Sequence, residues 1–442
     1  MLGVFFMKKD NFSLIKNLSP VLGEIKLVES FERVRQHYDE PKFWYYSASI
    51  NDNHLKHDGV HFHSKASGVS FFSQNKAVLK ALAEAIERYN NFAFFNKEVS
   101  FIGSYSEVNT KAINPEKFTY FSDKQLLQTK YKKFRIDDKS LFRWTEMRSL
   151  SSKKSCLVPC QVVYLSYQPI KGEPVIYPSI STGAAGHFDL FSAILGGIYE
   201  VLERDAFMIY YLNKLKPKRY DLRSSNNEKI TKLLNIAQRY NLKIFSMDIR
   251  TDLGIPAVAS VVIDESGFSK AVSVGLKSHL DIESAIVGSI NEAFHTRTWI
   301  RESYIQNPKN ISKTELIKNS TIKNRGIFWY SPKSILKLDF FIKNSDLIKT
   351  ESANTDLSVQ NQLRVLRKAL ANKGHKVYYK DITSKYFKDI PFKVVKVVIP
   401  GMQPVYLNEK YPLQGGERLR SVPSSLGYKN NTKLNTYPHP FL

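Results

Sequence analysis

One short string of charged residues occurs twice in the chain, each time inside an apolar stretch with helical periodicity. The string reads E-x-x-E-R, and its two copies lie 116 residues apart: Glu84, Glu87 and Arg88, then Glu200, Glu203 and Arg204. Residues three apart stack on one face of a helix, so each copy presents two carboxylates together. Carboxylates among apolar neighbours are costly unless something neutralises them. The fold must therefore supply counter-charges to two acidic helix faces.

Apolar periodicity predicts four helices and four strands. The helices are expected over about 74–95, 189–213, 281–304 and 359–373. Asp189 and Asp281 stand at the starts of the second and third helices, where an aspartate caps free backbone N–H groups. Strands are expected over about 257–264, 268–275, 376–380 and 392–399, with a Glu-Ser-Gly turn joining the first two. The predicted fold class is mixed α/β (α+β) with antiparallel hairpins.

The simplest interpretation of one E-x-x-E-R string is a salt bridge to its own arginine, or an exposed helix face. Two copies in apolar helices make coincidence a weaker explanation. If the helices approach each other, four carboxylates converge and raise one another's pKa values unless divalent cations lie between them. Mg²⁺ prefers oxygen ligands and usually shares a few carboxylates with substrate phosphates. The strings therefore predict a carboxylate-held magnesium–nucleotide site.

Two other segments are candidates for the same site. The third predicted helix carries Glu292 and Arg297, within N-E-A-F-H-T-R. Ahead of the second helix, residues 181–186 read S-T-G-A-A-G, and such small residues let a ligand approach backbone N–H groups near a helix start. That turn alone is weak evidence, because small residues before a helix are common. The strings G-x-x-x-x-G-K-[ST] and G-x-G-x-x-G, which mark other nucleotide-binding folds, do not occur.

Composition and charge exclude several classes of protein, among them disordered, fibrous and membrane-spanning ones. The chain has 442 residues, of which 43% are hydrophobic, enough for a large core and too ordinary a mix for disorder or a fibrous protein. Its net charge is +24, but the cations are scattered along the chain, which favours compositional drift, an anionic ligand or a peptide partner over nucleic acid. No apolar run reaches the length of a membrane span, and MLGVFFMKKD lacks the order of a signal peptide. We therefore expect a cytoplasmic protein without membrane contact.

Cysteines and a histidine-rich segment are the other candidate reactive groups. Cys156 and Cys160 are the only two cysteines, which favours a reducing compartment, and we expect them as small buried apolar side chains. Clustered imidazoles can bind transition metals, and four fall within ten residues: His54, His57, His61 and His63. Their irregular spacing and the lack of a nearby cysteine favour a solvated loop instead.

Several segments together resemble the YcaO family, and the resemblance covers most of the chain. They are KALAEAIERY, STGAAG followed by EVLERDAF, SINEAFHTR, PFKVVKVVIPGMQP and the final YPHPFL. The resemblance implies a compact α/β domain with an ATP site unlike that of P-loop proteins or kinases. It divides the chain into an N-terminal segment over 1–65 and a catalytic domain over 66–442, with an excursion at 308–358 and a proline-containing tail at 437–442.

The resemblance also assigns roles to residues. It implies that four glutamates bind Mg²⁺: Glu84, Glu87, Glu200 and Glu203. It implies that six residues line the ATP pocket: Arg88, Ser181, Thr182, Arg204, Glu292 and Arg297. The tail residues Pro438, Pro440 and Leu442 are expected close to the active site as catalytic elements, since proline restricts the chain and limits the entropy lost on placement. Arg418, in GGERL, is a candidate for placing the tail or the nucleotide.

The implied reaction is ATP-dependent activation of a peptide backbone amide. A nucleophile adds to the amide carbon, the resulting oxyanion attacks the γ-phosphate, and phosphate then leaves. With Cys, Ser or Thr of a ribosomally made precursor peptide as nucleophile, the product is a thiazoline or oxazoline. The segment before residue 70 is short for a fused leader-binding domain, so we expect a separate partner, resembling either a ubiquitin-activating enzyme or TfuA. The sequence leaves a homodimer open.

Three positions depart from the family pattern. Lys80 stands where the family often has serine, His295 where many members carry glutamine, and Leu442 where a final proline is usual. Two alternative functions stay open, of which the second is motivated by Lys80 and His295. One is thioamide formation with external sulfide and a TfuA-type partner, and the other is a catalytically silent basic scaffold that binds peptides.

Overall fold

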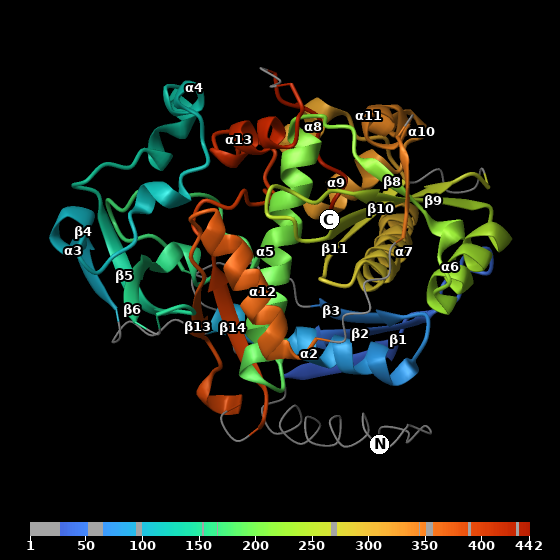
Figure 1. Ribbon diagram of the computed structural model, residues 1–442, viewed down its shortest axis with the longest axis horizontal. Coiled ribbons are helices and arrows are strands. Elements are labelled where there is room, and N and C mark those ends of the chain that lie inside the picture. Colours follow the sequence, from blue (N-terminus) through green and yellow to red (C-terminus); the bar gives the residue numbers. More distant parts are fainter. Residues whose placement is uncertain are drawn as a thin grey trace.

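Three β-sheets with long helices against them make up the computed structural model of the chain (Figure 1). The structure describes residues 27–51, 65–93, 100–152, 154–165, 167–266, 272–343, 345–350, 357–387, 390–429 and 433–442. The histidine-rich segment lies outside these residues. So do the first 26 residues of the segment expected to lead into the core.

The first sheet has three antiparallel strands in the order β1-β2-β3. They are β1 (Val28–Arg33), β2 (Trp44–Ile50) and β3 (Lys65–Ser70). Helix α2 (Gln74–Ala93) packs on β3 so closely that a Cβ on Gly68 would meet the carbonyl oxygen of Ala77 at 2.0 Å. Glycine at this position therefore brings the first E-x-x-E-R helix down onto the sheet.

The second sheet has five strands in the order β11-β10-β9-β8-β12. They are β8 (Lys218–Asp221), β9 (Leu242–Asp248), β10 (Ala257–Asp264), β11 (Val272–Ser278) and β12 (Leu347–Lys349). Every residue of β10 is buried, as expected for a central strand. Helices α6 (Glu228–Arg239) and α7 (Ile282–Gln306) pack against this sheet. Asp281 caps α7 by accepting a hydrogen bond from the Ser284 N–H.

The third sheet has six strands, in the order β4-β5-β13-β14-β7 with β6 paired to β5. They are β4 (Phe101–Ser104), β5 (Leu141–Ser149), β6 (Ser155–Pro159), β7 (Ala184–His187), β13 (Tyr378–Asp381) and β14 (Lys393–Val398). Helix α12 (Val359–Asn372) lies over helix α5 and buries Leu363, Leu366 and Leu370.

Helix α5 (Leu190–Leu212) is the centre of the molecule. Figure 1 shows it running between the second and third sheets, and it contacts β7, β10, β11 and β14. A helix that is apolar on all sides needs such a buried position. Asp189 caps its start by accepting a hydrogen bond from the Ser192 N–H. The second E-x-x-E-R string is therefore surrounded by protein, whereas the first lies on a helix that packs mainly on the first sheet and touches the third at β7 and β14.

Short helices fill the connections. They are α3 (Tyr105–Val108), α4 (Asp123–Leu126), α8 (Lys313–Lys318), α9 (Ile322–Trp329), α10 (Pro332–Ile335), α11 (Asp339–Ile342) and α13 (Arg418–Ser425), with 3₁₀ turns at Pro115–Phe118, Thr129–Phe134, Cys160–Val162, Leu222–Ser224, Leu336–Leu338 and Lys385–Phe387. The segment expected as an excursion contains α8 to α11 and ends in β12, which pairs parallel to β8.

The predicted elements agree well with the structure. All four predicted helices are present within about three residues, as α2, α5, α7 and α12. The strand expected over 257–264 is β10, and those expected over 376–380 and 392–399 are β13 and β14. The strand expected over 268–275 begins at Val272 in the described residues and continues to Ser278. The mixed α/β class is confirmed.

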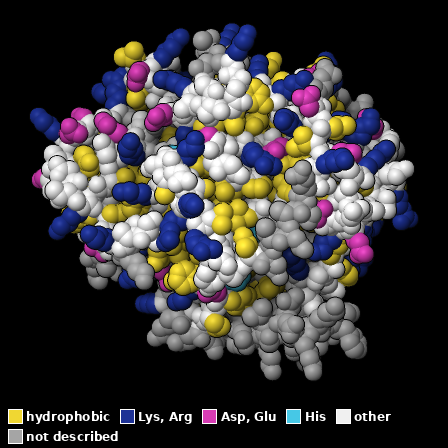
Figure 2. All heavy atoms as spheres, in the orientation of Figure 1, with side chains coloured by type: hydrophobic (Ala, Val, Ile, Leu, Met, Phe, Trp, Pro, Cys, Tyr) yellow, Lys and Arg dark blue, Asp and Glu magenta, His cyan; other side chains and the backbone are white. Residues whose placement is uncertain are grey.

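Among the described residues, no helix is long and apolar enough to cross a bilayer. Lys and Arg side chains are spread over the face in Figure 2 and do not gather above one element.

Candidate functional site

The first E-x-x-E-R string lies on α2, where its arginine serves one glutamate. Arg88 donates to Oε1 of Glu84 from Nε at 2.9 Å and from a terminal nitrogen at 2.7 Å. The other Glu84 oxygen accepts the Ser67 N–H at 2.8 Å. Glu87, one helical turn on, accepts the Gly186 N–H of β7 at 3.0 Å. The first string therefore pairs Glu84 with its arginine and leaves Glu87 facing the third sheet.

The second string lies on α5, where one arginine serves both glutamates. Arg204 donates to Glu203 at 2.8 Å and to Glu200 at 3.4 Å. Glu203 is 4% exposed, and its other oxygen accepts the Ser278 N–H of β11 at 3.2 Å. The guanidinium also lies 4.1 Å from the centre of the Phe441 ring. Arg204 is thus held from two sides.

Electrostatic contacts join the two strings into one site. Burial, followed by the charges of Glu200 and Glu84, raises the pKa of Glu87 to about 8. Burial also raises the pKa of Glu200, with Arg204 lowering it and Glu203 raising it. Two carboxylates that lie close together within a protein raise each other's pKa, because each disfavours the charged form of the other. The charge of Glu200 on the second string therefore acts on Glu87 of the first, although the strings lie 116 residues apart in the sequence.

Helix α7 adds the third predicted element. Glu292 accepts the Leu276 N–H at 2.5 Å, and burial raises its pKa to about 7, with Arg204 lowering it and Glu203 raising it. His295 lies 3.3 Å from the Ser67 hydroxyl, and burial lowers its pKa to about 4. Its imidazole is neutral at pH 7 and faces Glu84 of the first string.

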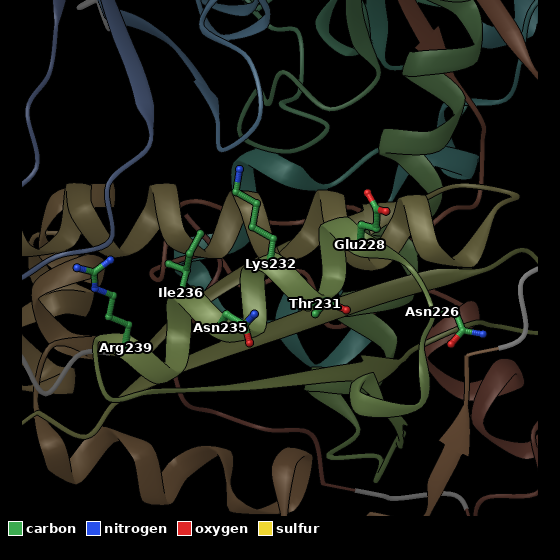
Figure 3. Close-up of a pocket in the computed structure, with 7 residues that line it drawn as sticks. All are labelled: Asn226, Glu228, Thr231, Lys232, Asn235, Ile236 and Arg239. Atoms are coloured by element: carbon green, nitrogen blue, oxygen red, sulfur yellow. The ribbon is translucent and has the colours of Figure 1, made fainter.

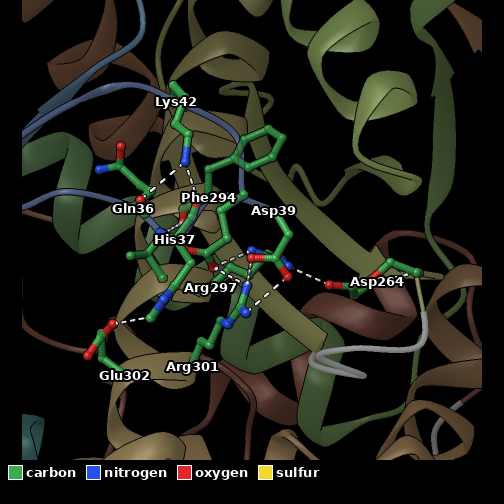
Figure 4. A network of polar contacts seen from close by, with 12 residues as sticks. Gln36, His37, Asp39, Lys42, Asp264, Phe294, Arg297, Arg301 and Glu302 are labelled. Atoms are coloured by element: carbon green, nitrogen blue, oxygen red, sulfur yellow. Dashed lines mark hydrogen bonds and ion pairs between the residues drawn. The ribbon is translucent and has the colours of Figure 1, made fainter.

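Arg297 occupies a different place from the other predicted residues. It donates to Glu40 at 2.7 Å and to Asp264, while the neighbouring Arg301 binds Asp39 at 2.9 and 3.0 Å (Figure 4). Five residues after Glu292, its side chain points to another side of α7. The structure thus puts Arg297 in a buried ion network that joins α7 to the β1–β2 connection and to the end of β10.

The turn at 181–186 leads into β7. Ser181 is exposed and Thr182 half-buried. Gly183 has φ +85°, and a Cβ there would meet the Val397 carbonyl oxygen at 2.2 Å. Both the conformation and the close approach require glycine at this position. The turn therefore lies directly against β14.

Two lysines in this region were not singled out from the sequence. Lys396 of β14 is 4% exposed and donates to the carbonyl oxygens of Ile180 at 3.1 Å and Thr182 at 2.7 Å. Burial lowers its pKa to about 8, and Glu200 and Glu87 oppose that shift. Lys277 of β11 acts on Glu200 and Glu292, and its stem passes Gly288, where a Cβ would lie 2.7 Å from Lys277 Cγ. A charged residue among the valines of FKVVKVVI was the available signal for Lys396.

Lys80 also belongs to this region. Its side chain is exposed overall, but its ammonium donates to the Val69 carbonyl oxygen at 3.3 Å. Partial loss of water around this end lowers its pKa to about 8, with the charges of Lys76 and Lys277 adding to the shift and Glu292 and Glu84 opposing it. The departure from the family pattern at this position therefore adds a cation to the set of charges around the carboxylates.

The proline-containing tail packs against α5. The Tyr211 hydroxyl donates to the Pro438 carbonyl oxygen at 2.8 Å, and His439 lies 2.7 Å from the Tyr406 carbonyl oxygen. Pro440 is buried, and Leu442 reaches Gly326 of α9. Through Phe441, the tail touches Arg204 of the second string.

The remaining candidates from the sequence, Arg418 and the two cysteines, make contacts that support the fold. Arg418 binds Asp205 and Asp252, at 2.8 and 2.9 Å, and thereby ties α13 to α5. Cys160 is buried and Cys156 half-buried, both are free thiols, and burial raises their pKa values to about 12 and 11. A separate hollow lies on the outer face of α6, lined by Glu228, Lys232 and Arg239 among others (Figure 3).

A magnesium ion needs several oxygen ligands at once. Within the described ranges, no three His, Cys, Asp or Glu side chains are arranged to hold a metal as they stand. Arg88 and Arg204 occupy oxygens of three of the four glutamates. The chemistry nevertheless fits, because carboxylate oxygens suit Mg²⁺ and Glu87 shares its surroundings with Glu200, a repulsion that a divalent cation would relieve.

A family comparison matches most of the chain. Residues 71–403 match the family described as "YcaO cyclodehydratase, ATP-ad Mg2+-binding". An uncharacterized protein of Methanothermobacter thermautotrophicus is 25% identical over 287 residues, which cover 64% of this chain and 71% of that one. An "uncharacterized protein in tfuA 3'region" of Rhizobium leguminosarum bv. trifolii is 29% identical over 164 residues, 35% of this chain and 38% of that one.

Solved structures share the fold. A "heterocyclase in complex with substrate and cofactor" superposes with a TM-score of 0.79 at 22% identity, over 98% of this chain and 57% of that chain. YcaO from Methanopyrus kandleri, bound with AMPPCP and Mg²⁺, superposes with a TM-score of 0.62 at 16% identity, over 90% of this chain and 92% of that one. The chain therefore spans little more than half the length of the heterocyclase whose fold it shares.

Proposed function

Because the chain belongs to the YcaO family, we propose that it uses ATP and Mg²⁺ to activate backbone amides of a ribosomally made precursor peptide. The products are thiazoline or oxazoline rings formed from Cys, Ser or Thr. The observation that carries this proposal is the electrostatic contact between Glu87 of the first string and Glu200 of the second. Two acidic helix faces that meet in this way repel each other, and a divalent cation bound between them would relieve that repulsion.

In this proposal the four string glutamates hold Mg²⁺, which would neutralise charge on the phosphates of the nucleotide. Arg88 and Arg204 would exchange part of their carboxylate contacts for phosphate oxygens, which match a guanidinium equally well. Ser181, Thr182 and Glu292 would line the nucleotide pocket. Arg297 is proposed only as a support for α7, since Glu40 and Asp264 already bind its guanidinium.

The proposed chemistry balances as a cyclodehydration. The peptide's thiol or hydroxyl adds to the preceding carbonyl carbon and loses its proton, and the carbonyl oxygen takes the γ-phosphoryl group of ATP, releasing ADP. Phosphate then leaves as the C=N bond forms and the amide nitrogen loses its proton. This chain's residues must bind the phosphates, keep water out and orient the peptide.

The tail takes part in that arrangement. Pro438, Pro440 and Leu442 would present the peptide next to Arg204, since Phe441 already stacks on that guanidinium. The precursor peptide would be delivered by a separate leader-binding partner. A homodimer is compatible with this proposal, which does not require one.

The genomic description of one relative favours a second candidate reaction. The Rhizobium protein is described by its place in a tfuA 3' region. In the second candidate, with a TfuA-like partner present, external hydrosulfide adds to the amide carbon and the carbonyl oxygen takes the γ-phosphoryl group of ATP, releasing ADP. Phosphate then leaves with that oxygen as the C=S bond forms and the sulfur loses its proton, and the product is a thioamide.

Product mass separates the candidates. The protein is incubated with ATP, Mg²⁺, a precursor peptide and each partner protein, and the peptide is weighed. Loss of one water per modified residue supports cyclodehydration, and exchange of oxygen for sulfur supports thioamide formation. Absence of peptide-dependent ATP consumption with either partner would contradict both and leave the silent scaffold.

A further inference from the structure

A buried lysine stands at the centre of strand β14. Lys396 is 4% exposed, and its neighbours along the strand, Val394, Val395 and Val397, are almost completely buried. An ammonium group in such surroundings is costly unless it is hydrogen-bonded and faces opposite charge. The groups that surround the ammonium therefore indicate the role of this lysine.

The first partners are backbone carbonyls of the turn before β7. Lys396 Nζ donates to the Thr182 carbonyl oxygen at 2.7 Å and to that of Ile180 at 3.1 Å. Next to it, the Val397 N–H donates to the Gly183 carbonyl oxygen at 2.7 Å. Lys396 is paired in register with Ala184, so the turn is fastened from the side chain and from the backbone of one strand.

Beyond these hydrogen bonds, the lysine lies in the field of two carboxylates, one from each E-x-x-E-R string. The charges of Glu200 and Glu87 both act on the Lys396 ammonium. Glu87 also accepts the Gly186 N–H, and Gly186 is paired in register with Val394 of the same strand. Strand β14 thus connects the turn at 180–183 with the place where the two strings meet.

We propose that Lys396 is a positioning residue for nucleotide binding, which holds the Ser181–Thr182 turn in place and offsets the charge of Glu87 and Glu200. This inference rests on the proposed function, because it assumes that the turn and the carboxylates bind the same nucleotide. An anionic nucleotide then meets a turn already fixed and a site whose negative charge is reduced.

The proposal predicts opposite effects on two ligands. Removal of one positive charge beside Glu87 and Glu200 makes the site more negative, so a divalent cation alone binds as well as before or more tightly. A nucleotide loses both the fixed turn and the favourable charge, so it binds more weakly. A lysine that merely stabilises the fold would weaken both ligands together when replaced.

The test compares Lys396→Met and Lys396→Gln with wild type. A matched control is Lys393→Met on the same strand, since Lys393 is partly exposed and lies 3.7 Å from Asp381. Calorimetry measures the affinity for β,γ-methylene-ATP in the presence of Mg²⁺. Electron paramagnetic resonance measures the affinity for Mn²⁺ without nucleotide. We expect nucleotide affinity at least about tenfold weaker in Lys396→Met and a smaller loss in Lys396→Gln, which loses the charge but keeps a donor for the carbonyl oxygens. Mn²⁺ affinity should be unchanged or higher in both, and Lys393→Met should have wild-type values for both ligands.

Three outcomes would overturn the proposal. Wild-type nucleotide affinity in the Lys396 variants would show that the lysine has no positioning role, while the proposed function stands. A parallel loss of nucleotide and Mn²⁺ affinity would assign the lysine to the fold alone. Failure of the wild-type chain itself to bind the nucleotide with Mg²⁺ would contradict the proposed function, and the role of Lys396 with it. Lys396→Gln, which can still donate to the carbonyl oxygens, carries the test if Lys396→Met does not fold.

Discussion

The same five-residue string has two different surroundings in this molecule. On α2, Arg88 binds Glu84 near the surface, with side chains 37% and 30% exposed, and Glu87 is left facing Glu200. On α5, Arg204 binds both glutamates and is itself 13% exposed beneath Phe441. An identical string therefore produces a half-open ion pair in one helix and a closed, buried one in the other.

The difference follows from the position of each helix. Helix α2 packs mainly on the three-stranded sheet and also touches β7 of the third sheet, whereas α5 is enclosed between the second and third sheets. Burial strengthens charge interactions and also increases the cost of leaving a charge alone. The second string is therefore the rigid half of the candidate site, and the first string contributes the glutamate that lacks an arginine of its own.

The largest expected contrast is between the two arginines. Arg204→Met leaves Glu203 buried without its cation and should lower the free energy of unfolding by about 3–5 kcal/mol. Arg88→Met breaks a half-exposed pair and should lower it by less than about 1 kcal/mol. Urea unfolding in EDTA measures both. Equal losses would contradict the distinction between a rigid and an open half.

The contact between Phe441 and Arg204 gives a smaller effect. Phe441→Leu keeps an apolar side chain but removes the ring face, which should lower stability by about 0.5–2 kcal/mol and weaken nucleotide binding through a less fixed Arg204. Phe441→Tyr, which keeps the ring, is the control for both measurements. Identical behaviour of the two variants would show that the ring face has no role.

Glu87 of the first string predicts a dependence of stability on pH. A carboxyl whose pKa is raised on folding stabilises the protein while protonated, and that stability is lost as pH rises toward the folded value. For Glu87 the loss extends from its ordinary pKa of 4.5 to about 8. The melting temperature in EDTA should therefore fall less between pH 4.5 and about 8 for Glu87→Gln than for wild type. Parallel curves would place Glu87 outside a buried, acidic environment.

His295 gives the smallest expected effect. Its imidazole is neutral at pH 7 because burial lowers its pKa to about 4, and its polar contact is with the Ser67 hydroxyl. A glutamine amide can make the same contact, so His295→Gln should change stability by less than about 1 kcal/mol and turnover by less than about threefold. A large loss of turnover without loss of stability would assign the imidazole a chemical role.

The sequence predicted the parts of the site that depend on local spacing. Apolar periodicity located α2, α5, α7 and α12 but not the twelve-residue α6, and the two strings indicated that four carboxylates would converge if their helices approached. It did not indicate Lys396 or Lys277, because each lies on a strand and acts on glutamates far away in the chain. Only the packing of β14 and β11 against α5 brings these lysines to the carboxylates.

The placement of Arg297 shows the limit of motif reasoning. Its motif put it with Glu292, but a residue five positions further along a helix points in another direction. Two carboxylates from elsewhere in the chain, Glu40 and Asp264, then determine its surroundings. Spacing within a motif predicts which residues share a helix, and only the fold shows which of them share a site.

The central claim is that the two strings form a single magnesium–nucleotide site. Calorimetry of β,γ-methylene-ATP, with and without Mg²⁺, measures it directly in wild type, Glu87→Gln, Glu200→Gln and the double variant. We expect Mg²⁺-dependent binding in wild type, a loss of at least about tenfold in each single variant, and a double variant little worse than either, because residues in one site do not act additively. Additive losses, or Mg²⁺-dependent binding that survives in both single variants, would contradict a shared site.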